Sequence, residues 1–152
     1  MNKFFIGVIV TNSWLVFALG SAGFAALTAI FGKMGVENVN SNMATFFRTF
    51  IIMIVSAIII SINSDWQRID KFSSRTIIFL VLSGIATGFS WLCYYRALQL
   101  GHVAQVASVD KLSVALAIVL AAIFLGESLT WQTAIGGMLI VAGSIVIALP
   151  KF

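Results

Sequence analysis

Five apolar stretches of about 20 residues constrain the fold of this chain more than any other feature of its sequence. A helix of that length crosses the hydrocarbon core of a bilayer, because each residue adds about 1.5 Å. The predicted spans are residues 13–32, 43–62, 76–98, 103–126 and 131–149. Barrel strands alternate in polarity over about ten residues, whereas these stretches are twice as long and apolar on every side. Because only a helix satisfies its own backbone within such a stretch, the sequence predicts an all-α membrane protein, a bundle of five transmembrane helices with its termini on opposite faces.

Charged residues are too few to cover a water-facing surface. They make up 9% of the 152 residues, against 61% hydrophobic residues, whereas soluble domains carry roughly 25% charged residues. The lipid bilayer is therefore the expected main partner, and no nucleic acid is expected to bind. We expect a short interfacial lead-in over residues 1–12 and one transmembrane domain over residues 13–149.

Metal and cofactor chemistry has little support in this composition. The chain has one cysteine, Cys93, and one histidine, His102. Four-ligand zinc and iron–sulfur sites lack their ligands, and no intrachain disulfide can form. No cofactor is expected, and the residues needed for an intramembrane enzyme cannot be assembled from one histidine and one acid within the spans.

Polar residues between the spans indicate where the helices begin. The pair Ser41-Asn42 is predicted to cap the second helix, either Ser73 or Ser74 the third, and Thr130 the fifth.

Charges inside two spans are the first candidates for a functional site. Arg48 lies about 7 Å into the second helix, and Asp110 and Lys111 lie about 10–12 Å into the fourth. Helices that began after these charges would keep only about 14 or 15 residues, too few to cross a bilayer. A charge at the centre of a span costs roughly 2.5–3.5 kcal/mol, so a partner, a cavity or a ligand path should face it. Arg48 and Lys111 could instead extend their long side chains to the headgroups, an escape that the short Asp110 lacks.

Alternation of the spans places these charges and Arg96 in the same half of the bilayer. The third helix presents polar and aromatic residues on one face, because Ser83, Thr87, Ser90, Trp91 and Tyr94 follow helical spacing. This face could line a polar vestibule, or serve interhelical hydrogen bonding and an aromatic belt, and the two roles are compatible. The predicted substrate-pathway residues are Arg48, Ser90, Trp91, Tyr94, Arg96, Asp110 and Lys111.

Glycines on two helices favour close helix packing. Gly84 and Gly88 form a G-x-x-x-G pattern in the third helix, and Gly136 and Gly143 lie two turns apart in the fifth. We expect Gly136 and Gly143 to form a dimer interface. The alternative is packing against another helix of the same chain.

Four segments together resemble a known family. They are FAALTAIFGK (24–33), WLCYYRAL (91–98), VDKLS (109–113) and FLGE (124–127). This combination resembles the EamA domain of the drug/metabolite transporter superfamily, in its five-helix bacterial and archaeal branch, over nearly the whole chain. The segment GGMLIVAG (136–143) is also similar to the dimerising last helix of the small multidrug resistance relatives.

The resemblance implies one half-unit of a ten-helix transporter in the cytoplasmic membrane. Larger members are similar to two such units fused in inverted orientation, so a homodimer is implied, with an antiparallel arrangement as one option. The expected activity is secondary transport, in the direction of export, of a small polar metabolite by alternating access. The excess of cations among the candidate residues favours an anionic or zwitterionic substrate. The alternative is a non-transporting scaffold or regulatory subunit.

One departure from the relatives bears on the mechanism. The small multidrug resistance proteins bind cationic drugs and protons through a glutamate in their first helix, whereas residues 13–32 contain no acid. Proton-coupled export of lipophilic cations by that mechanism is therefore in doubt, and Asp110 is the expected coupling or counter-charge residue.

Overall fold

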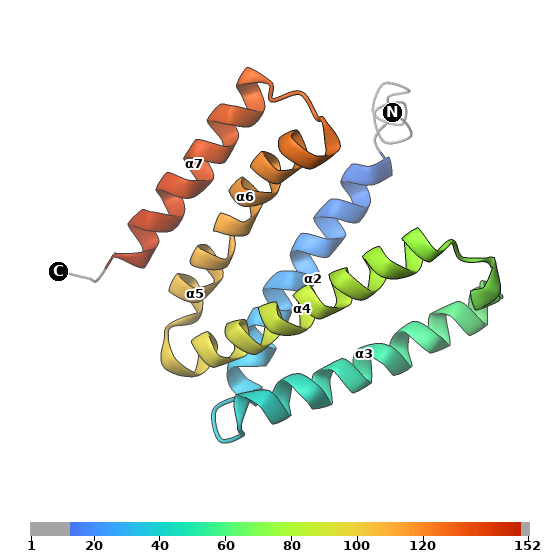
Figure 1. The fold of residues 1–152 in the computed structure, drawn as a ribbon. Coiled ribbons are helices and arrows are strands. Elements are labelled where there is room, and N and C mark those ends of the chain that lie inside the picture. The colour runs from blue at the N-terminus through green and yellow to red at the C-terminus, as the bar shows by residue number, and fades with distance from the viewer. Residues whose placement is uncertain (1–12, 150–152) are drawn as a thin grey trace, which may run out of the picture.

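The computed structural model describes residues 13–149, and within that range the chain is helical with no strand (Figure 1). Five helical segments are long and apolar enough to cross a membrane, which confirms the predicted fold class. Four of them are the single helices α2 (Ser13–Gly35), α3 (Ser41–Asn63), α4 (Ser74–Leu100) and α7 (Trp131–Ala148). The remaining span is divided into α5 (Val103–Asp110), α6 (Leu112–Leu120) and the π-helical turn η2 (Ala121–Leu125). The expected lead-in over residues 1–12 lies outside the described residues.

The helices converge at one end and diverge at the other (Figure 1). Along the chain, α3 packs against α4, and α7 packs against α5 and α6, while α2 contacts α4 and α5. The converging end carries the α2–α3 loop and the α4–α5 turn. The small buried core lies here, around Val36, Tyr95 and Leu98. The buried core therefore lies at one end of the bundle, whereas α7 packs along both α5 and α6.

Two of the three predicted caps are confirmed. The hydroxyl of Ser73 accepts a hydrogen bond from the Thr76 backbone N–H at 3.1 Å, and that of Thr130 accepts one from Thr133 at 3.2 Å. The prediction for α3 was wrong, because the cap is Asn40, whose side-chain oxygen accepts from the Asn42 N–H at 2.9 Å. Asn40 precedes the first helical residue, and only a side chain at that position reaches back to the free N–H groups of the first turn.

The first helix extends three residues beyond its predicted end and is fixed there by Lys33. The Lys33 ammonium donates to the backbone oxygens of Leu98, at 2.6 Å, and Gly101, at 3.1 Å. These carbonyls lie at the end of α4, where they lack helical partners and carry the negative end of the helix dipole. Beside them, Gln99 Nε2 donates to the oxygens of Val36 and Val39. Side chains thus tie α2 and the α2–α3 loop to the end of α4.

Replacement of Lys33 by methionine is expected to destabilise the protein. The variant keeps an apolar stem but leaves two carbonyl groups without their charged donor, a loss of about 1–3 kcal/mol. The apparent Tm in detergent should fall by several degrees. Lys71→Met is the matched control, because Lys71 lies in the α3–α4 loop and its ammonium makes no hydrogen bond or ion pair to a described residue. Equal Tm values for the two variants would contradict the role assigned to Lys33.

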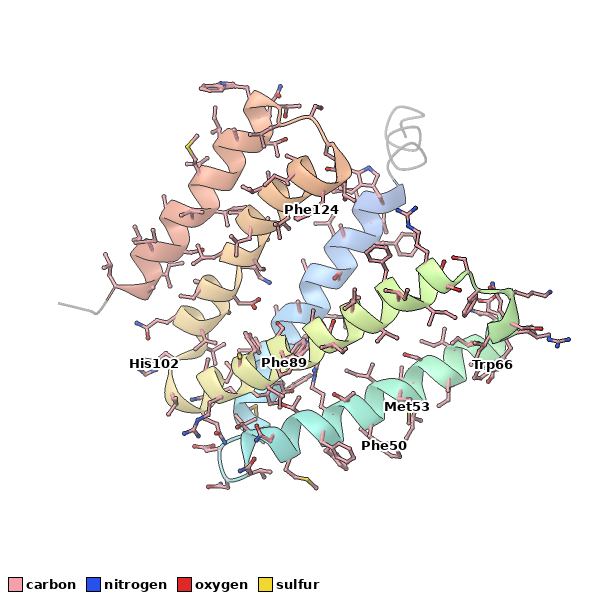
Figure 2. All side chains as sticks on the ribbon, viewed as in Figure 1. Phe50, Met53, Trp66, Phe89, His102 and Phe124 are labelled. Carbon is pink, nitrogen blue, oxygen red and sulfur yellow. The ribbon has the colours of Figure 1, made fainter. Side chains whose placement is uncertain are left out.

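Apolar side chains cover the outside of the helices. Phe50 and Met53 project from α3 and Phe89 from α4, whereas Trp66 and His102 mark the loops at opposite ends (Figure 2). Such a continuous apolar surface requires lipid or another apolar partner. A Cβ atom at Gly84 or Gly88 would meet nothing within 4 Å, so the protomer itself does not use this close-packing pattern.

Candidate functional site

Arg48 rests on an aromatic cluster of α4. Its guanidinium carbon lies 3.3 Å from the centre of the Trp91 ring and 5.6 Å from that of Tyr95. Trp91, Tyr94 and Tyr95 share one helix face at positions i, i+3 and i+4. Trp91 packs edge-on against Tyr94, with ring centres 5.4 Å apart, and obliquely against Tyr95, at 5.8 Å. Trp91 and Tyr95 thus hold Arg48 at the interface of α3 and α4, and Tyr94 supports Trp91.

The aromatic rings stabilise this cation without neutralising it. A cation over an indole face gains roughly 0.5–2 kcal/mol, which offsets part of the cost of a charge within a span. Two ion pairs occur among residues 14–149, Arg68–Asp70 and Lys111–Asp110, and neither involves Arg48. The Arg48 guanidinium also donates no hydrogen bond to a described residue. Its N–H groups are therefore available to a ligand.

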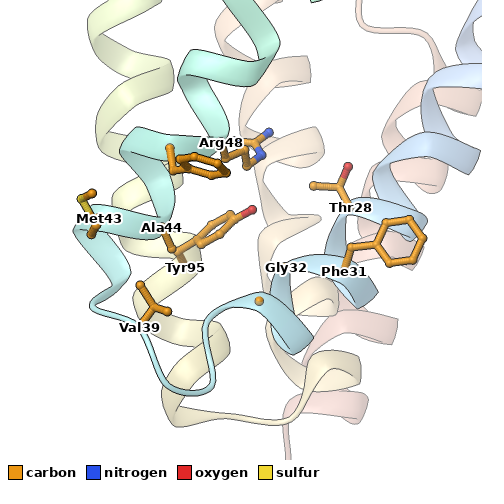
Figure 3. A pocket seen from close by; sticks show the side chains of 10 residues that line it. Thr28, Phe31, Gly32, Val39, Met43, Ala44, Arg48 and Tyr95 are labelled. Carbon is orange, nitrogen blue, oxygen red and sulfur yellow. The ribbon is translucent and has the colours of Figure 1, made fainter.

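A cavity of about 540 Å³ opens beside Arg48, where α2, α3 and α4 meet (Figure 3). Its volume lies within the roughly 300–1,000 Å³ typical of small-molecule sites. Tyr95 forms one wall, with its hydroxyl directed towards α2, and Arg48 lies above it. The lining residues are Thr28, Phe31, Gly32, Gly35, Val39, Met43, Ala44, Phe47, Arg48 and Tyr95.

The helix that carries Asp110 and Lys111 is interrupted at these residues. Val103–Leu125 forms one span, as predicted, but α5 ends at Asp110 and α6 begins at Leu112, with a one-residue turn at Lys111 that the sequence did not indicate. The Lys111 N–H bonds the oxygen of Ser108, at 3.1 Å, and the Val114 N–H bonds that of Lys111, at 3.0 Å. These bonds span three residues instead of four and tighten the backbone locally. Within a membrane, irregular backbone of this kind is tolerated where protein or a water-filled cavity surrounds it.

Asp110 and Lys111 pair with each other. Lys111 Nζ lies 3.4 Å from Asp110 Oδ2, so the two charges compensate locally. Tyr94 packs against the same buried core as Val103 and Val106 of α5, so the aromatic cluster under Arg48 lies beside the start of the helix that carries Asp110.

The other two predicted pathway residues do not join this cluster. Arg96 donates to Gln99 Oε1 at 3.0 Å and borders a separate depression with Lys33 and Glu37. Ser90 is exposed and makes no side-chain hydrogen bond within the described part of the chain. Further along the same face, Thr87 donates to the Ser83 backbone oxygen of its own helix.

Several cavity residues were missed by sequence reasoning. Tyr95 carried a usable signal, because it lies four residues after Trp91 on the same helix face. Thr28 and Phe31 carried none, because apolar residues lie on every side of α2 and their spacing does not indicate which side meets α3. Among residues 13–149, no group of three His, Cys, Asp or Glu side chains could hold a metal ion.

Five membrane-spanning helices, three of which meet at the cavity beside Arg48, define a multi-pass membrane protein. Residues 12–149 match the model of the EamA-like transporter family, and the chain therefore belongs to this family of membrane transporters.

Two curated relatives extend the comparison. The chain is 46% identical over 138 residues to a Sinorhizobium protein named "Uncharacterized transporter in cobO 3'region", covering 91% of this chain and 98% of that protein. It is 28% identical over 136 residues to human solute carrier family 35 member G1, covering 89% of this chain but 36% of the human protein. The chain thus spans about a third of the human relative's length. No solved structure is significantly similar to it.

Proposed function

We propose that the protein is a secondary transporter that exports a small polar metabolite across a bacterial or archaeal cytoplasmic membrane. The observation that carries this proposal is Arg48, a cation without a carboxylate partner beside a cavity of metabolite size. A charge within a membrane span is energetically costly, so we expect Arg48 to bind a ligand from outside the chain.

A homodimer that works by alternating access completes the proposal. The first half of α4, residues 74–90, is exposed along its whole length, so much of the protomer's apolar surface is free for a second copy or for lipid. The protomer matches a minor part of the human relative's length, which favours a half-unit that needs a partner. The two copies would stand parallel or antiparallel and enclose the substrate path between them.

The polar residues take different roles in this scheme. Arg48 binds the substrate, Trp91 holds Arg48 in place, and Tyr94 supports Trp91. Asp110 and Lys111 couple transport to an ion or to the substrate. At an interrupted helix, Asp110 can exchange Lys111 for a proton, and Lys111 can then bind a substrate charge. Arg96 lies at the mouth of the path near the converging end, and Ser90 lines the path in the assembled dimer.

Flux in vesicles tests the transport activity. Purified protein reconstituted into liposomes should show saturable uptake or counterflow of at least one solute from a panel of organic anions, zwitterions and cations. Protein inserted in one orientation and loaded from each side in turn tests the direction. A folded, reconstituted protein that moves no member of the panel would instead favour the non-transporting scaffold.

Substitution of Asp110 should show whether this residue couples transport to an ion or only neutralises Lys111. Asp110→Asn leaves Lys111 without its partner, at a cost of up to about 3 kcal/mol within the membrane, and we expect lower stability and loss of transport. The double variant Asp110→Asn/Lys111→Gln restores neutrality and should recover the apparent Tm. Transport that stays absent in the double variant supports a coupling role. Transport that returns with the Tm would reduce Asp110 to a structural counter-charge.

A further inference from the structure

The cavity beside Arg48 contains one kind of charge. Arg48 is the single ionisable side chain of fixed charge among its lining residues, and no carboxylate lines it. The only other hydrogen-bonding side chains there are Thr28 and Tyr95. The Thr28 hydroxyl already donates to the Phe24 oxygen at 2.8 Å, whereas the Tyr95 hydroxyl makes no hydrogen bond to a described residue.

The geometry of Arg48 suits a carboxylate. One face of the guanidinium lies against Trp91 at 3.3 Å, so its N–H groups point outward in the guanidinium plane. A planar fork of this kind binds a carboxylate through two parallel hydrogen bonds, and arginine stays protonated at any working pH. The Tyr95 hydroxyl lies on the cavity side of the same cluster and can donate to a carboxylate oxygen (Figure 3).

The remaining walls suit an apolar body. Thr28 and Phe31 border the cavity on α2, with the Phe31 ring turned outward, while Val39 and Ala44 lie beside Tyr95 on the side near the α2–α3 loop (Figure 3). Aromatic and aliphatic walls with few polar groups bind apolar ligand surface, while the polar groups fix the orientation.

An ammonium group or a second carboxylate would find no partner here. The lining residues offer no negative side chain for an ammonium, and Arg48 supplies one positive charge, enough for one carboxylate. On binding, the added group would lose hydration without gaining a charged partner among the lining residues, so both additions should weaken binding.

We propose that the cavity selects an amphipathic monoanion, a single carboxylate on an apolar body without an ammonium group. This inference rests on the proposed transport function and narrows its substrate class from anionic or zwitterionic solutes to monoanions. The carboxylate binds the Arg48 fork and the Tyr95 hydroxyl, and the apolar body lies against Val39 and Ala44.

The proposal is tested with 3-phenylpropionate and three ligands that each differ from it by one group. 3-Phenylpropionate is the monoanion, phenylalanine adds an ammonium at the carbon next to the carboxylate, and benzylmalonate adds a second carboxylate there. Propionate keeps the charge and lacks the ring. Binding is measured by thermal shift of the purified protein in detergent, which does not require transport.

The expected order of affinity places 3-phenylpropionate first, by about tenfold or more over each of the other three. Arg48→Gln should abolish its thermal shift, whereas Arg48→Lys, which keeps the charge without the planar fork, should bind with intermediate affinity. Phenylalanine or benzylmalonate binding as tightly as 3-phenylpropionate would overturn the proposal, as would binding that survives Arg48→Gln.

The two proposals fail in distinguishable ways. Vesicles that transport other solutes while none of the four ligands binds would overturn the substrate class and leave transport standing. Binding in the expected order without flux in vesicles would support the cavity's selectivity and contradict the transport function.

Discussion

Replacement of Arg48 by glutamine should reduce substrate transport in vesicles by about 10- to 100-fold. A hydrogen bond to a charged group contributes roughly 1.5–3 kcal/mol, and the substitution removes both the charge and the paired donors. The substituted side chain still fits against Trp91, so packing at the α3–α4 interface should persist. Initial rates in liposomes of matched protein content, with the same detergent-solubilised variant checked for monodispersity, give the comparison.

Arg75→Gln is the matched control for this variant. Arg75 lies near the start of α4, with its guanidinium carbon 5.8 Å from the centre of the Phe79 ring, and it does not line the cavity. Its replacement should leave the transport rate near that of the unmodified protein. If Arg48→Gln fails to fold, Arg48→Lys is measured in its place, because it keeps the charge and removes only the planar guanidinium. A folded Arg48→Gln protein with unchanged transport would make Arg48 an interfacial residue that only anchors α3.

Gly143→Leu should separate the two copies of the proposed homodimer. α7 uses one side for the protomer: Gly137 and Ser144 are buried, and a Cβ at Gly137 would lie 3.5 Å from the Ile118 side chain. Gly136 and Gly143 lie about 100° further around the helix, where a Cβ would meet nothing within 4 Å. The protomer thus leaves room for a larger side chain at Gly143. A second helix packed there would be held away, because close van der Waals contact is what associates helices in lipid.

Crosslinking reports the expected loss. Cys93 is the single cysteine, so a Cys93→Ser background with Ile140→Cys places one thiol between the two glycines on their helix face. We expect Gly143→Leu to lower the crosslinked dimer and the transport rate together, by about tenfold. Gly137→Leu is the contrasting variant, since it should strain the contact with Ile118 and lower the apparent Tm instead. An undiminished dimer in Gly143→Leu would place the interface on another surface.

Hydropathy and local polar signals were enough to predict the spans and two of their caps. A bilayer requires about 20 apolar residues with every backbone group satisfied, and this requirement acts on each segment separately. Ser73 and Thr130 were found for the same reason, because a cap bonds an N–H group within its own first turn. The cap of α3 was missed by one residue, since Asn40, Ser41 and Asn42 are all capable of capping and only the backbone path selects among them.

Only the tertiary structure determined which of the charges within the spans have a partner of opposite charge. In the sequence, Asp110 was the most conspicuous charge within a span, yet it pairs with its neighbour Lys111 at the interrupted helix. Arg48 keeps an aromatic contact and no carboxylate, because α4 brings Trp91 beneath it while no acid lies on the facing helices. The cavity forms where α2 meets α3 and α4. The sequence of α2 does not indicate which of its sides faces those helices. Contacts within a helix follow from the spacing of residues along the chain. The pairing of charges between helices depends instead on how each helix is rotated and where the helices cross. Helices that are apolar on every side carry almost no sequence signal for that rotation.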